Sequence, residues 1–323
     1  MHQVISLDPS QYKRHIIHSQ ERDWAETNCY VDIWIELLSA MGHEPLAALS
    51  FTLAIDFEGD QWTFFKFPLS DLFDIYKLDV QELALWQPLL THIDTQVKLG
   101  RPVLVELDSY HLPDTAGTAY QLNHVKSTVA IVEIDIEKEH MGYFHGQAYY
   151  YLENEDFINV FKPYEKTNTA ILPPYAEIVK SNSSDKYNQQ QTLAISLGLL
   201  KKQLRLIPEI NPFTKFKQKF IEDFEWLKQQ DLDTFHQYSF ATFRQFGACF
   251  ELASNYLSWL TKQGESDLLE CTNQIKSISE LAKIYQFQLA RSISRGKPLD
   301  ITAIDTMSEN WQLAMSHLKF KYL

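Results

Sequence analysis

Cys29 is the residue of this chain that most clearly combines a reactive side chain with a favourable local setting. It is one of 3 cysteines in 323 residues, and it follows Thr27 and Asn28, either of which is a typical N-cap residue. Apolar residues then recur at helical spacing until Gly42, which is a stop signal. Cys29 is therefore predicted in the first turn of a helix, where the positive end of the macrodipole favours the nucleophilic thiolate. The alternative is a small buried apolar residue.

A cysteine nucleophile needs a base, which is usually a histidine distant in sequence. Of the 11 histidines, His124 is the best placed, because it stands just before the β-branched run 127–134. That run predicts a strand, which would hold the imidazole ring in place while leaving it accessible. His145 ends a further strand-like segment and is predicted either to orient His124 or to be an ordinary polar strand end. The alternative for His124 is a solvated loop histidine.

Other reactive motifs are absent from the sequence. Asp56, Glu58 and Asp60 form a loose acidic cluster, but their spacing matches no metal-binding loop. The chain has no GxxxxGK[ST], GxGxxG or HExxH motif. We therefore expect neither a metal nor a cofactor.

Composition narrows the class of protein. The formal net charge of −13 disfavours nucleic-acid binding, and no run of about 18 apolar residues predicts a membrane span. The first residues lack the basic start and long apolar stretch of a signal peptide. The uneven positions of Cys29, Cys249 and Cys271 argue against a disulfide framework. A cytoplasmic protein is expected.

The periodicity of the chain divides it into two kinds of sequence. Residues 1–162 mix helices with strands and predict an α+β domain, since a helix precedes most of the sheet rather than alternating with it. The expected strands are 51–55, 62–67, 102–107, 127–134, 141–145 and 148–152, and further helices are expected at 71–78 and 80–100.

The remainder of the chain is predicted to be a connector and a bundle. Residues 163–190, with three prolines and a polar stretch, predict an extended connector. Residues 191–323 predict an all-α helical bundle domain, with helical patterns at 211–227, 231–261, 266–294 and 301–318. The aromatic stripe from Phe240 to Tyr256 is expected in the bundle core.

Four stretches resemble a bacterial family of uncharacterised proteins, a domain of unknown function. The stretches are Glu21 to Leu38, Asp56 to Phe67, Leu112 to Thr118, and Phe240 to Ala248. This resemblance extends over nearly the whole chain.

The order of a helix-start cysteine, a strand, a loop and a histidine that opens the next strand is similar to the butirosin-biosynthesis acyltransferase family. Those proteins are in turn similar to papain-like cysteine peptidases. The resemblance implies a papain-like N-terminal core with a mixed or antiparallel sheet. It also implies transfer of an acyl or aminoacyl group from a carrier-protein phosphopantetheine thioester to a small-molecule or peptide amine. Cys29 matches the nucleophile of that pattern, and His124 matches its histidine.

The third position of the pattern, usually Asp or Asn, falls near His145, which cannot supply a fixed negative charge. Asp135 or Asp114 is the expected substitute, unless a Cys–His pair works alone. Asp23 stands where the pattern has a Gln that supports the oxyanion hole. Asn28 or the backbone N–H of Cys29 is expected to take over that role.

The sequence also allows two other functions. The same fold with water as the acceptor would be a cysteine peptidase, amidase or thioesterase. A degraded papain-like core would be a non-catalytic binding or scaffold protein. A basic cluster in the acidic chain predicts either a docking face for an acidic carrier protein or a solvated helix face. It consists of Lys201, Lys202, Arg205, Lys215, Lys217 and Lys219.

Overall fold

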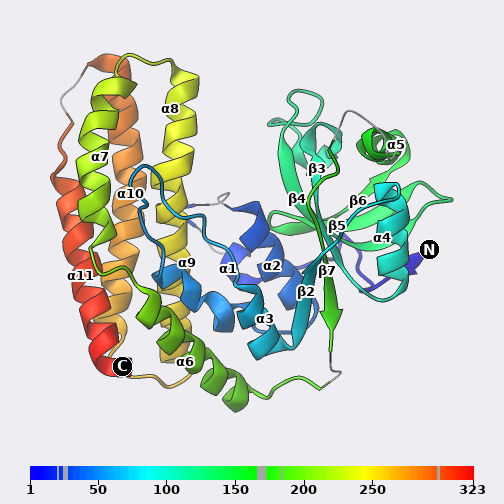
Figure 1. The fold of residues 1–323 in the computed structure, drawn as a ribbon, viewed down its shortest axis with the longest axis horizontal. Coiled ribbons are helices and arrows are strands. Elements are labelled where there is room, and N and C mark those ends of the chain that lie inside the picture. The colour runs from blue at the N-terminus through cyan, green and yellow to red at the C-terminus, as the bar shows by residue number, and fades with distance from the viewer. Residues whose placement is uncertain (20–21, 25–27, 166–171, 183–184, 297–298) are drawn as a thin grey trace. The chain divides into compact units, whose positions relative to one another are not determined.

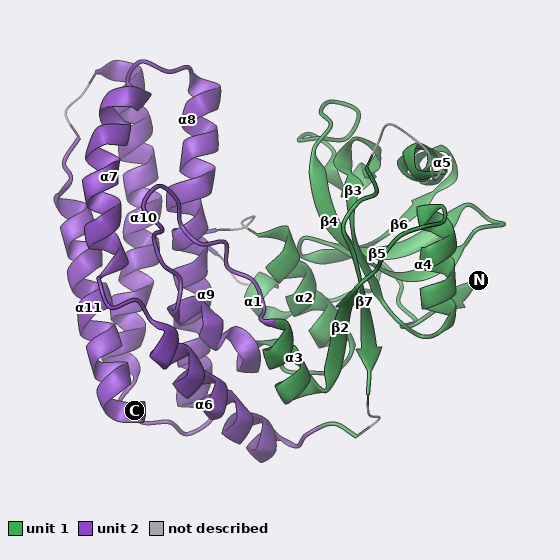
Figure 2. Cartoon of the chain, in the orientation of Figure 1, with its two compact units in different colours: residues 1–19, 28–45, 69–186 green, residues 20–27, 46–68, 187–323 purple. Residues whose placement is uncertain are grey.

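The computed structural model (Figure 1) consists of two compact units, each assembled from three separate stretches of the chain (Figure 2). The first unit contains residues 1–19, 28–45 and 69–186, and the second contains residues 20–27, 46–68 and 187–323. The structure describes all residues except 20–21, 25–27, 166–171, 183–184 and 297–298. No helix in these described ranges is long and apolar enough to cross a membrane.

An antiparallel sheet forms the centre of the first unit. Its described strands are β1 His2–Gln3, β2 Leu78–Glu82, β3 Val103–Asp108, β4 Lys126–Asp135, β5 His140–His145, β6 Ala148–Glu153 and β7 Ala176–Ser181. Their spatial order is β2-β7-β3-β4-β5-β6, and β1 pairs with the end of β4. The long strand β4 is bonded to both β3 and β5, so it places the residues at its start next to the end of β3.

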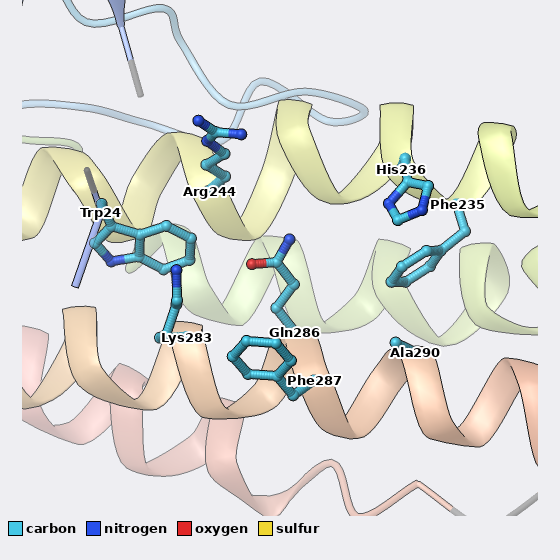
Figure 3. A pocket seen from close by; sticks show the side chains of 8 residues that line it. All are labelled: Trp24, Phe235, His236, Arg244, Lys283, Gln286, Phe287 and Ala290. Atoms are coloured by element: carbon cyan, nitrogen blue, oxygen red, sulfur yellow. The ribbon is translucent and has the colours of Figure 1, made fainter. Parts of the chain in front are cut away.

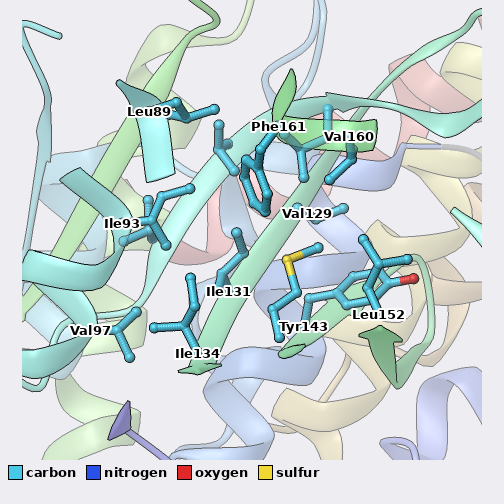
Figure 4. Close-up of a cluster of buried hydrophobic side chains, with 14 of the residues drawn as sticks. Leu89, Ile93, Val97, Val129, Ile131, Ile134, Tyr143, Leu152, Val160 and Phe161 are labelled. Atoms are coloured by element: carbon cyan, nitrogen blue, oxygen red, sulfur yellow. The ribbon is translucent and has the colours of Figure 1, made fainter. Parts of the chain in front are cut away.

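One face of the sheet is covered by helices α4 Leu89–Lys98 and α5 Asn154–Phe161 (Figure 4). Successive side chains of a strand point to opposite faces, and Val103, Val105 and Leu107 all belong to the apolar cluster on this face. The other face therefore carries the intervening residues of β3, which are Leu104, Glu106 and Asp108.

Helix α2, Cys29–Ala40, lies on the opposite face of the sheet and packs against β4 and β5. This helix is apolar on nearly every side and is buried from Tyr30 to Leu38, as expected for a helix enclosed in a core. Two shorter helices belong to the same unit, α1 Ile16–Ser19 and α3 Leu69–Tyr76, and α3 packs against β2.

The second unit is helical, as the sequence predicts. Its helices are α6 Gln189–Leu206, α7 Pro212–Leu227, α8 Leu232–Ser239, α9 Gln245–Lys262, α10 Leu269–Arg295 and α11 Thr302–Tyr322. A π-helical turn, Phe240–Arg244, joins α8 directly to α9. Fully buried aromatic rings form its core, and edge-on and tilted contacts join Phe216, Phe220, Phe243 and Phe246.

The prediction of strands at 51–55 and 62–67 is wrong. The first lies in a 3-10 helix, Pro45–Leu53, and the second makes only an isolated bridge between Phe57 and Trp62. Both aromatic rings instead pack on Phe216 of the bundle. Burial among helices therefore accounts for the strand-like composition, since no neighbouring strand pairs with these residues.

The helix predicted at 80–100 is also wrong over its first part, where β2 pairs with β7. Helix α4 starts only at Leu89, after Pro88, whose ring is tolerated at a helix start but not inside a helix. The segment 163–190, predicted as an extended connector, contributes β7 to the sheet between β2 and β3. The α+β class with a helical C-terminal region is confirmed.

Gly142 of β5 provides a test of this packing. A Cβ at this position would lie 1.9 Å from Tyr149 Oη on the paired strand β6. Because overpacking a core costs about 1–3 kcal/mol, we expect Gly142→Ala to lower the free energy of unfolding by about 2 kcal/mol in urea titrations. A Cβ added at Gly198 of α6 would meet no atom within 4 Å, so Gly198→Ala is the control. It should be neutral or stabilising by up to about 1 kcal/mol, and equal losses in both variants would contradict the packing.

Candidate functional site

Cys29 is the first residue of α2, where the sequence predicts it. Asn28 is the N-cap, and its side-chain oxygen accepts a hydrogen bond from Val31 N at 3.2 Å. The other predicted cap, Thr27, lies outside the described residues. Cys29 is half-buried and forms no disulfide, whereas Cys249 and Cys271 are buried. Of the three thiols, only Cys29 is thus accessible to a reagent.

The neighbouring residue Tyr30 fixes this first turn over the sheet. Its hydroxyl donates to Glu177 Oε2 at 2.8 Å, and Tyr175 donates to Glu177 Oε1 at 2.6 Å. Burial and the Glu177 carboxylate raise the pKa of the Tyr30 phenol well above its usual range, so it remains a neutral donor. The two phenols together satisfy a carboxylate that is almost entirely buried.

His124 stands in the loop before β4 and is paired with Asp108, the last residue of β3. His124 Nδ1 donates to Asp108 Oδ2 at 2.6 Å, and its ring stacks on Tyr110 with centroids 4.4 Å apart. This arrangement leaves Nε2 available as a base. The His124 side chain is 71% exposed, so substrate could reach it. Asp108 was not among the predicted site residues, and its position at a strand end is the only signal for it.

Cys29 and the His124–Asp108 pair belong to the same face of the sheet. Leu104 of β3 lies opposite Glu177 of β7, and strand alternation puts Asp108 on the face of Leu104. Tyr30 reaches Glu177 on this face. Among the described residues, however, no hydrogen bond joins Cys29 Sγ to His124.

His145 and Asp114 are brought together, but around Ser127 rather than around His124. His145 Nδ1 donates to Asp114 Oδ2 at 2.5 Å, and Tyr143 donates to Asp114 Oδ1. The Ser127 hydroxyl lies 2.6 Å from His145 Nε2. Because Asp114 takes the Nδ1 proton, Nε2 is left to accept from Ser127. The two strands β4 and β5 and the loop before β4 therefore build a continuous Ser–His–Asp chain.

The Ser127 chain lies on the other face of the sheet from Asp108. Residues two apart in a strand point to the same face, so Ser127 shares a face with Val129, and His145 shares one with Tyr143. Val129 and Tyr143 both belong to the apolar cluster under α4 and α5. Burial and Asp114 raise the pKa of Tyr143 far above its usual range, so its hydroxyl stays a neutral donor. The His145 side chain is 11% exposed.

Asp135 lies at the far end of β4 from His124. Nine residues separate it from Lys126, which corresponds to about 30 Å along a strand. It pairs with the N-terminal ammonium at 3.2 Å and with Lys138. Burial raises the pKa of Asp135, but these positive groups lower it by more, so the net shift is downward. Asp23 belongs to the second unit, where its backbone N–H donates to Glu251.

Three lysines of the basic cluster form ion pairs within the second unit. Lys215 pairs with Asp56 at 2.6 Å, Lys217 with Asp305 at 2.6 Å and Lys219 with Asp223 at 2.7 Å. These pairs reduce the field available to a partner. Among the described residues, no group of three or more His, Cys, Asp or Glu side chains could hold a metal ion.

Helix α2 also carries a buried ionic network whose residues were not among the predicted site residues. His18 Nδ1 donates to Glu36, and its Nε2 donates to Asp32 at 3.1 Å. Tyr12 donates to Glu36 Oε2 at 2.5 Å, and the backbone N–H of His15 donates to the same carboxylate. The available signal was the i, i+4 spacing of two carboxylates in an otherwise apolar helix, because buried charges require a partner.

The comparisons with known proteins match both halves of the chain to one family. Residues 13–181 match the model of the DUF1839 N-terminal domain, and residues 189–320 match that of the DUF1839 C-terminal domain. No curated protein matches the chain.

The His18 network predicts a characteristic pH dependence. Burial lowers the pKa of His18, but the hydrogen bonds to Asp32 and Glu36 outweigh it and leave the pKa above the usual 6.5. Protonated His18 therefore stabilises the fold at low pH, and this contribution is lost as the pH rises through the folded-state pKa. His18→Gln should cost about 3–5 kcal/mol at about pH 6 and progressively less toward about pH 9. Chemical denaturation at several pH values measures this difference.

His15 provides the control, because its pKa is shifted in the opposite direction. Burial lowers it, and Glu36 only partly offsets that effect. The cost of His15→Gln should therefore grow, not shrink, as the pH rises through the acid range. A cost of His18→Gln that does not vary with pH would contradict a charged His18.

Proposed function

The chain belongs to the DUF1839 family, and we propose that its first unit transfers acyl groups through a thioester on Cys29. The observation that carries this proposal is the position of Cys29. It opens a capped helix on the sheet face that also bears the His124–Asp108 pair. A helix start and a carboxylate-oriented imidazole are the two supports that a cysteine nucleophile requires.

The proposed reaction begins with attack of the Cys29 thiolate on the carbonyl carbon of a thioester donor. The bond from carbon to Cys29 Sγ forms and the bond to the donor sulfur breaks. His124, which has taken the proton of the Cys29 thiol, gives it to the leaving thiolate. An amine acceptor then attacks the Cys29 thioester. His124 takes the amine proton, and the Cys29 thiolate leaves as the amide forms.

Asp108 and the first turn of α2 have distinct parts in this scheme. Asp108 orients His124 through Nδ1 and stabilises the imidazolium. The first N–H groups of a helix have no partner within the helix, so the Cys29 N–H is suited to bind the oxyanion. His124 has to approach Cys29 when substrate binds, and catalytic hydrogen bonds commonly tighten only in that complex.

The resemblance to the butirosin-biosynthesis acyltransferase family supports a carrier-protein phosphopantetheine thioester as the donor. Lys201 and Arg205 on the exposed side of α6 are the part of the basic cluster best suited to attract an acidic carrier. The paired lysines of α7 contribute less to such attraction.

The decisive measurement is the intact mass of the protein after incubation with aminoacylated carrier proteins. We expect an acyl adduct on Cys29, no adduct with Cys29→Ala, and at least about tenfold slower formation with His124→Ala or Asp108→Asn. Product analysis with and without amines then separates transfer from hydrolysis.

The other two thiols are built-in controls for reactivity. Burial raises the pKa of Cys249 well above its usual value, and that of Cys271 to about 11. Iodoacetamide should therefore modify Cys29 in the folded protein and leave Cys249 and Cys271 intact. Slow alkylation of Cys29, with a rate unchanged in His124→Ala, together with no acyl adduct from any carrier, would favour a non-catalytic binding role.

A second candidate function is hydrolysis by Ser127, favoured by the unbroken chain from Ser127 through His145 to Asp114. In this reaction His145 takes the Ser127 proton as the hydroxyl attacks an ester carbonyl, and it gives this proton to the alcohol that leaves as the ester bond breaks. His145 then takes a proton from water, which attacks the acyl-serine and releases the acid and free Ser127. A fluorophosphonate should label Ser127 in the wild type but not in His145→Ala, as read by peptide mass spectrometry. If labelling is absent from the wild type, or unchanged in His145→Ala, the hydrogen bonds among Ser127, His145 and Asp114 serve only to hold β4, β5 and the loop together.

A further inference from the structure

The second unit contains a cavity of about 350 Å³ that the proposed acyl transfer does not use (Figure 3). It lies between the run from α8 to α9 and helix α10, and its size is in the range of small-molecule sites. The residues that line it are Trp24, Phe235, His236, Arg244, Lys283, Gln286, Phe287 and Ala290.

One end of the cavity is positively charged. Lys283 extends toward the Trp24 ring, and Arg244 lines the same end of the cavity with its guanidinium directed away from Lys283 (Figure 3). The described lining includes no Asp or Glu. No described carboxylate pairs with Lys283, whose Nζ lies 4.6 Å from the centroid of the Trp24 ring. In a chain with a net charge of −13, two cations that line one end of a cavity indicate a place for an anionic group.

The other end of the cavity is mainly apolar, with His236 as its polar residue (Figure 3). Lys283, Phe287 and Ala290 follow one another at i, i+4 and i+7, so they share one side of α10. Phe235 faces them from α8 (Figure 3), and Phe287 is 60% exposed although it is a large apolar side chain. A ligand that covers Phe287 would remove apolar surface from water.

The aromatic wall of the cavity is held rigidly. Trp24 Nε1 donates to Ser279 Oγ at 2.9 Å, and the indole ring lies directly on Gly247, where a Cβ would approach it to 2.4 Å. Arg244 ends the π-helical turn, a rare local structure that often occurs at functional sites. A fixed ring and a locally altered helix reduce the cost of ordering the site when a ligand binds.

From these features we infer that the cavity binds a small organic anion with an aromatic ring, such as an aryl carboxylate. The anionic group lies at Lys283, where Arg244 adds positive charge to the cavity wall, and the ring lies along Phe287 toward Phe235. Gln286, between the two ends, is placed to donate a hydrogen bond to the anionic group (Figure 3).

Calorimetric titration of the full-length protein with 2-naphthoate tests this inference, with the isosteric neutral 2-naphthamide as the comparison. We expect saturable one-site binding of 2-naphthoate and at least about tenfold weaker binding of the amide, because only the carboxylate forms an ion pair with Lys283. Equal affinity of the two compounds, or no saturable binding of 2-naphthoate, would overturn the inference.

Variants locate the binding in the cavity. Lys283→Gln should weaken the binding of 2-naphthoate by about tenfold without changing the affinity for the amide. Lys283→Arg should retain most of the affinity for 2-naphthoate. Lys276, which pairs with Glu280 on the same helix, is the matched control, and Lys276→Gln should bind normally. Ala290→Phe, which fills the apolar end, should abolish binding. Equal losses in Lys276→Gln and Lys283→Gln would overturn the assignment, and thermal melts of every variant exclude unfolding as the cause.

Discussion

The ionic network around His18 is the constraint on which the first unit depends. Asp32 and Glu36 lie on a helix that is buried on almost every side, and unpaired carboxylates there would be very costly. His18 and Tyr12 meet this requirement from a segment that precedes the helix. The same contacts hold the first turn of α2, so the position of Cys29 is set by charges one and two turns further along.

Strand alternation divides the polar residues of the sheet between two faces. Asp108 and Ser127 are paired-strand neighbours, since Asp108 lies opposite Lys126, yet they point to opposite sides. One face, the one on which α2 packs, therefore carries His124 with Asp108, and the other carries His145 with Asp114 and Ser127. A shift of one residue in the register of β4 would turn Ser127 to the other face and separate it from His145, so strand pairing decides which imidazole can serve which nucleophile.

Local signals in the sequence predicted part of this arrangement. Capping by Asn28, the helix that begins at Cys29 and the strand after His124 all follow from neighbouring residues. The partner of His124 could not be predicted from neighbouring residues. Asp108 is 16 residues away, and only the pairing of β3 with β4 brings the two together. The strands predicted within residues 51–67 were wrong for a related reason. Aromatic side chains in this segment pack on helices more than 140 residues later, such as the one that carries Phe216.

The discontinuous composition of the second unit has a consequence for synthesis on the ribosome. Trp24, Phe57 and Trp62 leave the exit tunnel long before α7 and α9, on whose aromatic side chains or backbone they pack. At about 5–20 residues per second, these large apolar side chains wait on the order of ten seconds or more for their partners. The nascent chain thus carries unburied aromatic rings while the sheet of the first unit is being completed, which makes it a natural client for chaperones that hold apolar segments.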